Sequence, residues 1–118
     1  MVLRESFDVE RIEAEQAAAG EPYREFLRVP SLSCGMYLLP AGGSDPQSPH
    51  AEDEVYYVLH GRATFDVGGH EHLVHPGSVV YVPANAPHRF HTIEEDLKLL
   101  VFFAPAEGSR SRPGRARA

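Results

Sequence analysis

The sequence has one cysteine, no tryptophan and no long apolar run, and each scarcity narrows what the chain can be. Because Cys34 is the only cysteine, an internal disulfide is excluded, which favours a reducing cytoplasm; we interpret Cys34 as a small buried strand residue. No stretch reaches the roughly 18 apolar residues of a transmembrane helix, so no membrane partner is expected. Residues 1–15 are charged and lack the apolar core of a secretion signal.

Basic residues are scarce outside the C-terminus. The net charge is −6, and residues 1–105 carry 7 Lys and Arg against 16 Asp and Glu, whereas residues 106–118 carry 4 Arg and 1 Glu. An acidic body repels phosphate, which argues against nucleic acid as a partner. The Arg-rich tail from residue 106 to residue 118 has few apolar residues to pack, so it is expected to be disordered.

The 118 residues, 42% of them apolar, form a single domain that begins with a short helix. Asp8 is a good N-cap, the segment from Val9 to Ala19 is rich in helix formers, and Gly20 stands where a helix-ending glycine belongs. Pro22 prevents continuation. The apolar stripe is thin, which indicates a covering helix. Residues 1–31 are taken as this helix with a leading strand, and residues 32–105 as the barrel described next.

From Tyr23 onward the apolar period becomes two, which predicts strands. Turn-forming Gly, Pro and acidic residues separate the runs, and Gly68-Gly69 is a hairpin signal. Eight or nine short strands at this spacing predict an all-β antiparallel sandwich or barrel. The expected strands cover residues 23–29, 32–39, 54–59, 63–67, 70–74, 78–82, 88–91 and 97–104, with residues 94–96 as an acidic turn.

Two strand beginnings carry candidate metal ligands. Glu54 opens an apolar strand, and a buried carboxylate needs a partner. If the chain is extended there, His50 shares the face of Glu54, and His88 opens a second strand. Two imidazoles and one carboxylate form a facial donor set for Fe(II), Mn, Ni, Zn or Cu. Tyr56 and Phe90 share the parity of these ligands, so they line the pocket or belong to the core.

The same two stretches resemble the paired motifs of the cupin superfamily. In the first motif a glycine and a His-x-His are followed by a glutamate three or four residues on, then by six residues and a glycine. In the second, a glycine is followed by five residues, a proline, one residue, a glycine, two residues, a histidine, three residues and an asparagine. The matching residues, within a resemblance that covers about residues 32–105, are His50, Glu54, Gly61, Gly77, Pro83 and His88, with Gly43 as a looser match.

The resemblance implies a double-stranded β-helix, also called a jelly roll or cupin barrel, with a divalent transition metal in its mouth. It also implies a homodimer, for which the final apolar strand and the N-terminal segment are candidate contacts. A small-molecule ligand is the expected partner.

Three positions depart from the family motifs. Ser48 replaces the first histidine, Asn85 replaces a glycine, and Thr92 replaces an asparagine. Asn tolerates positive φ, so Asn85 is acceptable. The missing histidine leaves two His and one Glu, with Gln47 as the candidate fourth ligand. The alternative is a cupin that kept the fold and lost its metal, with the histidines as polar pocket lining.

The remaining histidines are interpreted as ordinary surface residues. His70 and His72 follow a Gly-Gly turn at a barrel edge, His60 and His75 precede turns, and His91 has the opposite parity to His88.

Three possibilities remain open. The first is a metal-dependent dioxygenase or isomerase that acts on a small organic molecule, with Tyr56 or Glu52 as an acid–base group. The second is a non-catalytic module that binds a small ligand or a metal, because a fold does not fix a function. A structural protein with an empty pocket is the third.

Overall fold

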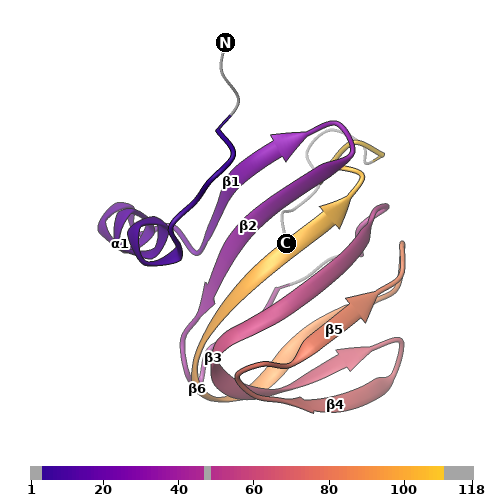
Figure 1. Cartoon of the computed structure of the whole chain (residues 1–118). Coiled ribbons are helices and arrows are strands. Elements are labelled where there is room, and N and C mark those ends of the chain that lie inside the picture. The colour runs from indigo at the N-terminus through magenta and orange to yellow at the C-terminus, as the bar shows by residue number, and fades with distance from the viewer. Residues whose placement is uncertain (1–3, 47–48, 111–118) are drawn as a thin grey trace.

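The computed structural model describes residues 4–46 and 49–110, which form one α-helix and six β-strands (Figure 1). Along the described chain the elements are α1 (Val9–Ala19), β1 (Tyr23–Val29), β2 (Leu32–Leu39), β3 (Asp53–Val67), β4 (His70–Val74), β5 (Val79–Val82) and β6 (His88–Ala104). The predicted all-β architecture with a short N-terminal helix is confirmed. Of the helices described, none has the length and apolar character needed to cross a membrane.

All pairings between the strands are antiparallel. The order is β1-β2-β6-β3-β4, and β5 pairs with the first part of β3. Figure 1 shows the sheet curling from β1 at the upper left to β4 and β5 at the lower right, so that its concave side encloses an interior. This curvature is what a jelly-roll barrel requires.

Two of the strands are longer than the sequence predicts. β3 runs through His60-Gly61, and β6 runs through the segment 94–96 that was expected to be an acidic turn. The two strands pair with each other from Asp53–Ala104 to Val67–His88, with register shifts between residues 58 and 64 of β3. Continuous pairing therefore overrides the local turn signals, which become β-bulges that bend the strands.

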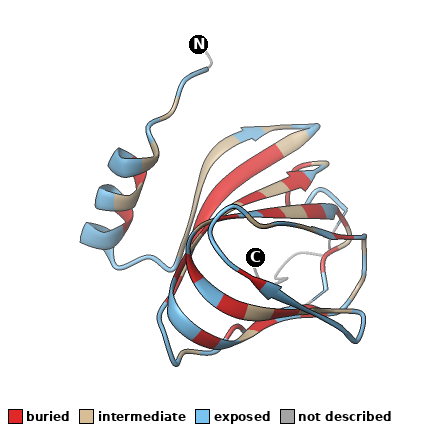
Figure 2. Cartoon of the chain, turned by 60° about the horizontal axis from the view of Figure 1, so that its bottom comes forward, coloured by how far each residue is buried: buried red, intermediate tan, exposed pale blue. Residues whose placement is uncertain are grey.

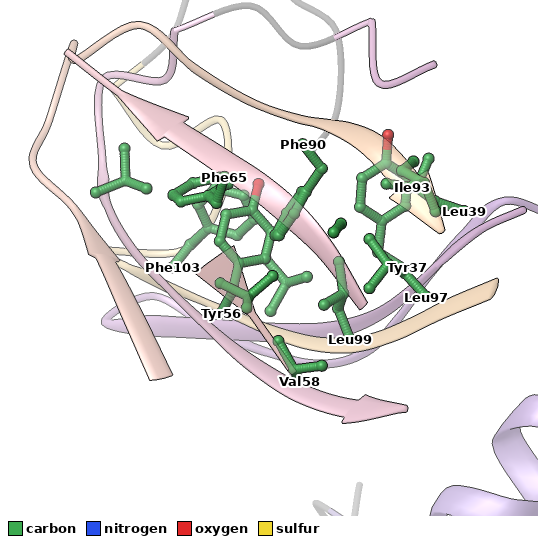
Figure 3. Close-up of a cluster of buried hydrophobic side chains, with 14 residues drawn as sticks. Tyr37, Leu39, Tyr56, Val58, Phe65, Phe90, Ile93, Leu97, Leu99 and Phe103 are labelled. Atoms are coloured by element: carbon green, nitrogen blue, oxygen red, sulfur yellow. The ribbon is translucent and has the colours of Figure 1, made fainter. Parts of the chain in front are cut away.

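The core lies inside the curled sheet. Burial alternates along β3, from the buried Glu54 through Tyr56 and Val58 to Phe65 (Figure 2). This alternation follows from the two-residue period of a strand. The inward side chains meet in one cluster, of which Figure 3 labels Tyr37, Leu39, Tyr56, Val58, Phe65, Phe90, Ile93, Leu97, Leu99 and Phe103.

The helix α1 covers the outside of the sheet, as its thin apolar stripe predicts. The Asp8 side chain accepts hydrogen bonds from the first-turn amides, and Gly20 ends the helix with φ 67°. Only Ile12 and Gln16 are buried, and Gln16 donates to the carbonyl oxygen of Met36 on β2 over 3.1 Å.

The segment 106–110 differs from the disordered tail that was expected to begin at residue 106. Ala106 and Glu107 are buried, and the Ala106 amide donates to the Pro30 carbonyl oxygen. This segment differs from the Arg-rich residues that follow it in sequence, because Ala106 is small and Glu107 is acidic. The rest of the expected tail, residues 111–118, lies outside the described residues.

We predict that Gly61→Ala destabilises the fold by at least about 2 kcal/mol. Gly61 has φ 100°, a conformation that costs a residue with a side chain about 1–3 kcal/mol. An added Cβ would also meet the backbone of Asp96 on β6. Urea denaturation measures the loss.

Gly68→Ala is the matched control. Gly68 also has positive φ, 58°, but a Cβ there meets nothing within 4 Å. The loss of stability in Gly68→Ala should stay near about 1–2 kcal/mol, which is the cost of the left-handed conformation alone. Equal losses for the two variants would contradict a close approach of β6 at Gly61.

Candidate metal centre

Three predicted ligands meet at one end of the barrel. Glu54 points inward from β3, where it pairs with Val82 of β5 and Phe103 of β6. His88 is the first residue of β6 and pairs with Val67 at the far end of β3. Glu54 and His88 meet only because β3 and β6 bend.

His50 belongs to the loop that precedes β3, and backbone bonds fix that loop against the one before His88. The Asn85 amide donates to the His50 carbonyl oxygen over 2.6 Å. The Ala84 amide donates to the Asp53 carboxylate over 2.9 Å. Asn85 adopts φ 67°, the left-handed conformation expected for an asparagine that replaces a glycine. The two loops that carry the histidines are therefore joined.

The three side chains are close enough to hold one ion. One potential ligand atom from each of His50, Glu54 and His88 lies within 4.8 Å of the others. His88 Nε2 and Glu54 Oε1 are 3.1 Å apart, and the His50 and His88 rings are centred 5.6 Å apart. All three residues are buried. Two imidazole nitrogens and a carboxylate oxygen are donors typical of divalent transition metals.

The hydrogen bonding supports this donor set. By strict geometry both Glu54 oxygens and His88 Nε2 are buried without a hydrogen bond to a described residue, although Glu54 interacts with the Tyr56 hydroxyl and with His88. Buried polar atoms are normally paired, so atoms without well-formed hydrogen bonds indicate a place for a bound group. The close approach of Glu54 Oε1 and His88 Nε2 lacks hydrogen-bond geometry, so we treat it as two acceptors facing a common point. The residues therefore fit a metal ion.

The other nitrogen of His88 fixes its tautomer. His88 Nδ1 lies 3.0 Å from the carbonyl oxygen of Ala86. A carbonyl only accepts, so Nδ1 carries the proton and donates it, and Nε2 keeps its lone pair. This is the arrangement found in histidines that bind metals.

Burial and charge act in opposite directions on His88. Burial lowers the pKa of its imidazole, but the adjacent Glu54 carboxylate, the Ala86 carbonyl and Asp45 together raise the pKa above its ordinary value. Burial, reinforced by the Glu54 charge, also raises the pKa of Tyr56 well above its usual range. The Tyr56 phenol is therefore protonated at neutral pH, next to the carboxylate.

Aromatic rings surround the three ligands. The His50 ring contacts Phe103 edge-on at 5.0 Å between centroids, and the His88 ring lies 6.1 Å from those of both Tyr56 and Phe65. In Figure 3 the labelled rings of Tyr56, Phe65 and Phe90 pack against one another inside the sheet. Tyr56 and Phe90 were predicted to line a pocket or fill the core, and the structure places both in the fully buried core.

A surface hollow of about 260 Å³ borders the centre. Its lining residues are Pro49, Asp66, Pro87, His88 and Arg89. A second hollow, of about 460 Å³, lies beside α1 and includes none of the three ligands. Of these two hollows, the first is the one that His88 lines.

Three buried carboxylates at this end of the barrel were not identified as site residues from the sequence. Asp45 accepts hydrogen bonds from the Tyr37 hydroxyl (2.7 Å) and the Phe90 amide (2.9 Å). Glu52, considered as an acid–base group, instead accepts backbone amides of the C-terminal segment. Glu107 lies near His50. Only an unusual burial of charge marks these residues, and sequence spacing does not reveal it.

The remaining candidates lie elsewhere. Gln47, the predicted fourth ligand, and Ser48 lie outside the described residues. His91 faces the outside of the barrel, where its Nε2 lies 2.8 Å from Glu71 Oε2 in a partly exposed group with Asp66. His60, His70, His72 and His75 are exposed.

Comparison with known proteins identifies the family. A family model described as a cupin domain matches residues 35–103, so the chain belongs to the cupin family. The resemblance drawn from the two sequence motifs is thereby confirmed, and the fold is that of a small single-domain cupin.

Three similar proteins illustrate the range of the family. The uncharacterized protein SCO3923 of Streptomyces coelicolor is 51% identical over 102 residues, 86% of this chain and 97% of that protein. Dimethylsulfoniopropionate lyase DddQ of Ruegeria pomeroyi is 32% identical over 74 residues, 62% of this chain and 37% of that protein. The DddQ crystal structure superposes with TM-score 0.64 at 26% identity, over 75% of this chain and 49% of that one. TT1209 of Thermus thermophilus superposes with TM-score 0.68 at 28% identity, over 87% and 99%.

We predict that the wild type loses folding stability as the pH rises because of Asp45, and that Asp45→Asn removes this loss. Burial raises the pKa of Asp45 from 3.8 to about 6. The folded state therefore prefers the protonated acid, and this preference is fully present below about pH 4 and lost as the pH rises through 6. The two-unit shift corresponds to about 3 kcal/mol.

Urea denaturation of metal-free wild type and Asp45→Asn, from pH 4 to 7, measures the effect. The stability of the variant relative to wild type should rise with pH by an amount of that order. The Asn side chain can still accept from the Phe90 amide. A difference that is independent of pH would contradict the raised pKa.

Proposed function

We propose that this chain is a small metal-binding cupin in which His50, Glu54 and His88 hold one divalent transition-metal ion. The observation that carries the proposal is that potential ligand atoms of three buried side chains, His50, Glu54 and His88, lie within 4.8 Å of one another, and that both Glu54 oxygens and His88 Nε2 lack hydrogen bonds of strict geometry. Leaving such atoms unpaired in the interior costs about 1–3 kcal/mol each, and an ion would satisfy them together.

The donor set is suited to Fe, Mn, Ni, Zn or Cu. The three ligands leave further positions on such an ion. Gln47 remains our candidate for a fourth ligand.

We propose further that the centre is catalytic and acts on a small organic molecule, as a dioxygenase or an isomerase. A metal ion there would supply Lewis-acid or redox chemistry. The aromatic rings around the ligands exclude water, and the protonated Tyr56 phenol offers a proton beside Glu54. The name of the relative DddQ, a lyase of dimethylsulfoniopropionate, supports a small molecule as substrate.

One observation favours the alternative, a non-catalytic module that binds a metal or a small ligand. The side chains of Glu54 and His88 have no exposed surface, and Tyr56, Phe65 and Phe90 fill the space behind them. A site this closed suits retention of an ion at least as well as turnover.

We predict that the protein purified without a His-tag binds one divalent ion per chain and that His88→Ala loses most of it. The substitution removes one of three ligands from a buried site, so affinity should fall by at least about 100-fold. Elemental analysis and chelator competition measure it. His70→Ala, which removes an exposed histidine, should bind like the wild type; equal binding by His88→Ala would contradict the site.

Turnover then separates the two functions. Oxygen consumption by iron-loaded protein is measured against small phenols, thiols and diketones, and isomerisation of the same compounds is followed by NMR. Activity that needs the ion and is lost in Glu54→Ala supports the enzyme. One bound ion without turnover supports the binding module.

We also propose a homodimer formed through the outer face of the sheet. In cross-strand register, Val79, Tyr57 and Leu100 form one row, and Tyr81 and Phe102 belong to the next. Val79, Tyr57 and Tyr81 are exposed although apolar or aromatic. Clustered exposed apolar side chains mark interaction surfaces.

We predict that light scattering gives twice the chain mass of 13.0 kDa and that the double variant Tyr57→Lys/Tyr81→Lys gives the single-chain mass. The introduced charges would be buried without partners in the dimer. A wild-type mass of 13.0 kDa would remove the proposal.

A further inference from the structure

The C-terminal segment 106–110 is fixed over the end of the barrel where the three ligands meet. The Glu107 amide donates to Ser33 Oγ on β2 over 2.8 Å. The Glu52 carboxylate accepts the Gly108 amide at 3.2 Å and the Arg110 amide at 2.9 Å. All these anchors use the backbone of the segment.

The Glu107 side chain is directed at His50. Its Oε2 lies 4.0 Å from His50 Nδ1, and both side chains are almost completely buried. The distance is that of an ion pair rather than a hydrogen bond. In a site of low dielectric, a carboxylate at this distance favours the tautomer that carries its proton on Nδ1.

The two histidines thus each have an oxygen acceptor on the side of Nδ1. Nδ1 of His88 faces the Ala86 carbonyl, and Nδ1 of His50 faces the Glu107 carboxylate. In each case an acceptor beside Nδ1 leaves Nε2 as the nitrogen with a free lone pair. Metal-binding histidines are commonly oriented by such an outer carboxylate or carbonyl.

The balance between the charges of the side chains and that of a divalent ion supports the same role for Glu107. Neutral imidazoles bring no charge, and Glu54 alone brings one negative charge to a divalent ion. Glu107 brings a second to the same buried end of the barrel. A buried charge is costly unless it is compensated, so two carboxylates fit an ion of charge +2 better than one does.

We propose that Glu107 is a positioning residue, which holds the His50 imidazole with Nδ1 protonated and Nε2 available to the ion. This inference rests on the proposed metal centre. Glu107 is not itself a ligand, since it does not belong to the group of atoms that lie within 4.8 Å of one another.

The test compares the affinities of full-length wild type, Glu107→Ala and Glu107→Gln for Zn²⁺ and Co²⁺, by chelator competition. Glu107→Ala should weaken binding about 10- to 100-fold, the usual effect of losing such a partner. Glu107→Gln keeps an oxygen acceptor and should recover part of the loss. Glu95→Ala removes an exposed carboxylate beside Arg62 and should bind like the wild type.

Two spectroscopic measurements separate positioning from other roles. In the Zn²⁺-loaded protein, ¹⁵N NMR should show His50 protonated on Nδ1, and this proton should exchange faster with water in Glu107→Ala. The visible spectrum of the Co²⁺ form should indicate the same coordination number in both variants as in the wild type. Because the anchors are in the backbone, both variants should fold when free of metal; if Glu107→Ala does not, Glu107→Gln carries the comparison.

The outcomes are distinct. If the wild type binds no metal, this inference falls together with the proposed function. If the wild type binds metal and Glu107→Ala binds it equally well, only the role of Glu107 is overturned. A changed Co²⁺ coordination number in Glu107→Ala would make Glu107 a ligand and overturn positioning.

Discussion

The bend of the β3–β6 pair is the constraint on which the rest of the structure depends. Glu54 pairs near one end of this ribbon and His88 at the other, opposite Val67. In a straight strand, residues 54 and 67 would lie roughly 40 Å apart. The Glu54 and His88 side chains nevertheless meet at 3.1 Å. Bulges around Gly61, where β6 leaves no room for a side chain, allow the ribbon to curl and bring its ends together.

Closing the barrel in this way buries four carboxylates of the described residues, and they differ in the groups that surround them. Asp45 and Glu52 accept hydrogen bonds from backbone amides, and Asp45 also from a tyrosine. Glu107 lies beside His50. Glu54 faces His88 without a hydrogen bond of ordinary geometry from any described residue. The first two carboxylates hold loops in place, whereas Glu54 is the one that the proposed function assigns to a metal ion.

Local signals predicted the helix, most strand positions and the three residues that meet in the candidate metal centre. Alternation places His88 and Glu54 on inward faces because strand geometry is local, and the family motifs select these two and His50 from a sequence rich in histidine and acid. The joining of short strands into β3 and β6 was missed, because tertiary pairing overrode the turn signals at Gly61 and residues 94–96. Asp45 and Glu107 were missed because their roles come from contacts between residues distant in sequence. Glu107 is a single acidic residue ahead of an arginine-rich stretch, and nothing in that pattern indicates that the chain is still packed there.

The pair of Glu54 and His88 also implies that protons would compete with the proposed metal ion at this site. Within the metal-free chain, the raised pKa of His88 means that a proton on Nε2 is favoured, since imidazolium and carboxylate then satisfy each other. A folded-state pKa above the unfolded one gives stability that is present at low pH and lost as the pH rises through the folded value. Above that pH the two acceptors face each other without a proton, and a divalent ion can take its place. On the proposed function, a proton or a metal ion would occupy this one buried pair, so protonation at low pH would oppose metal binding.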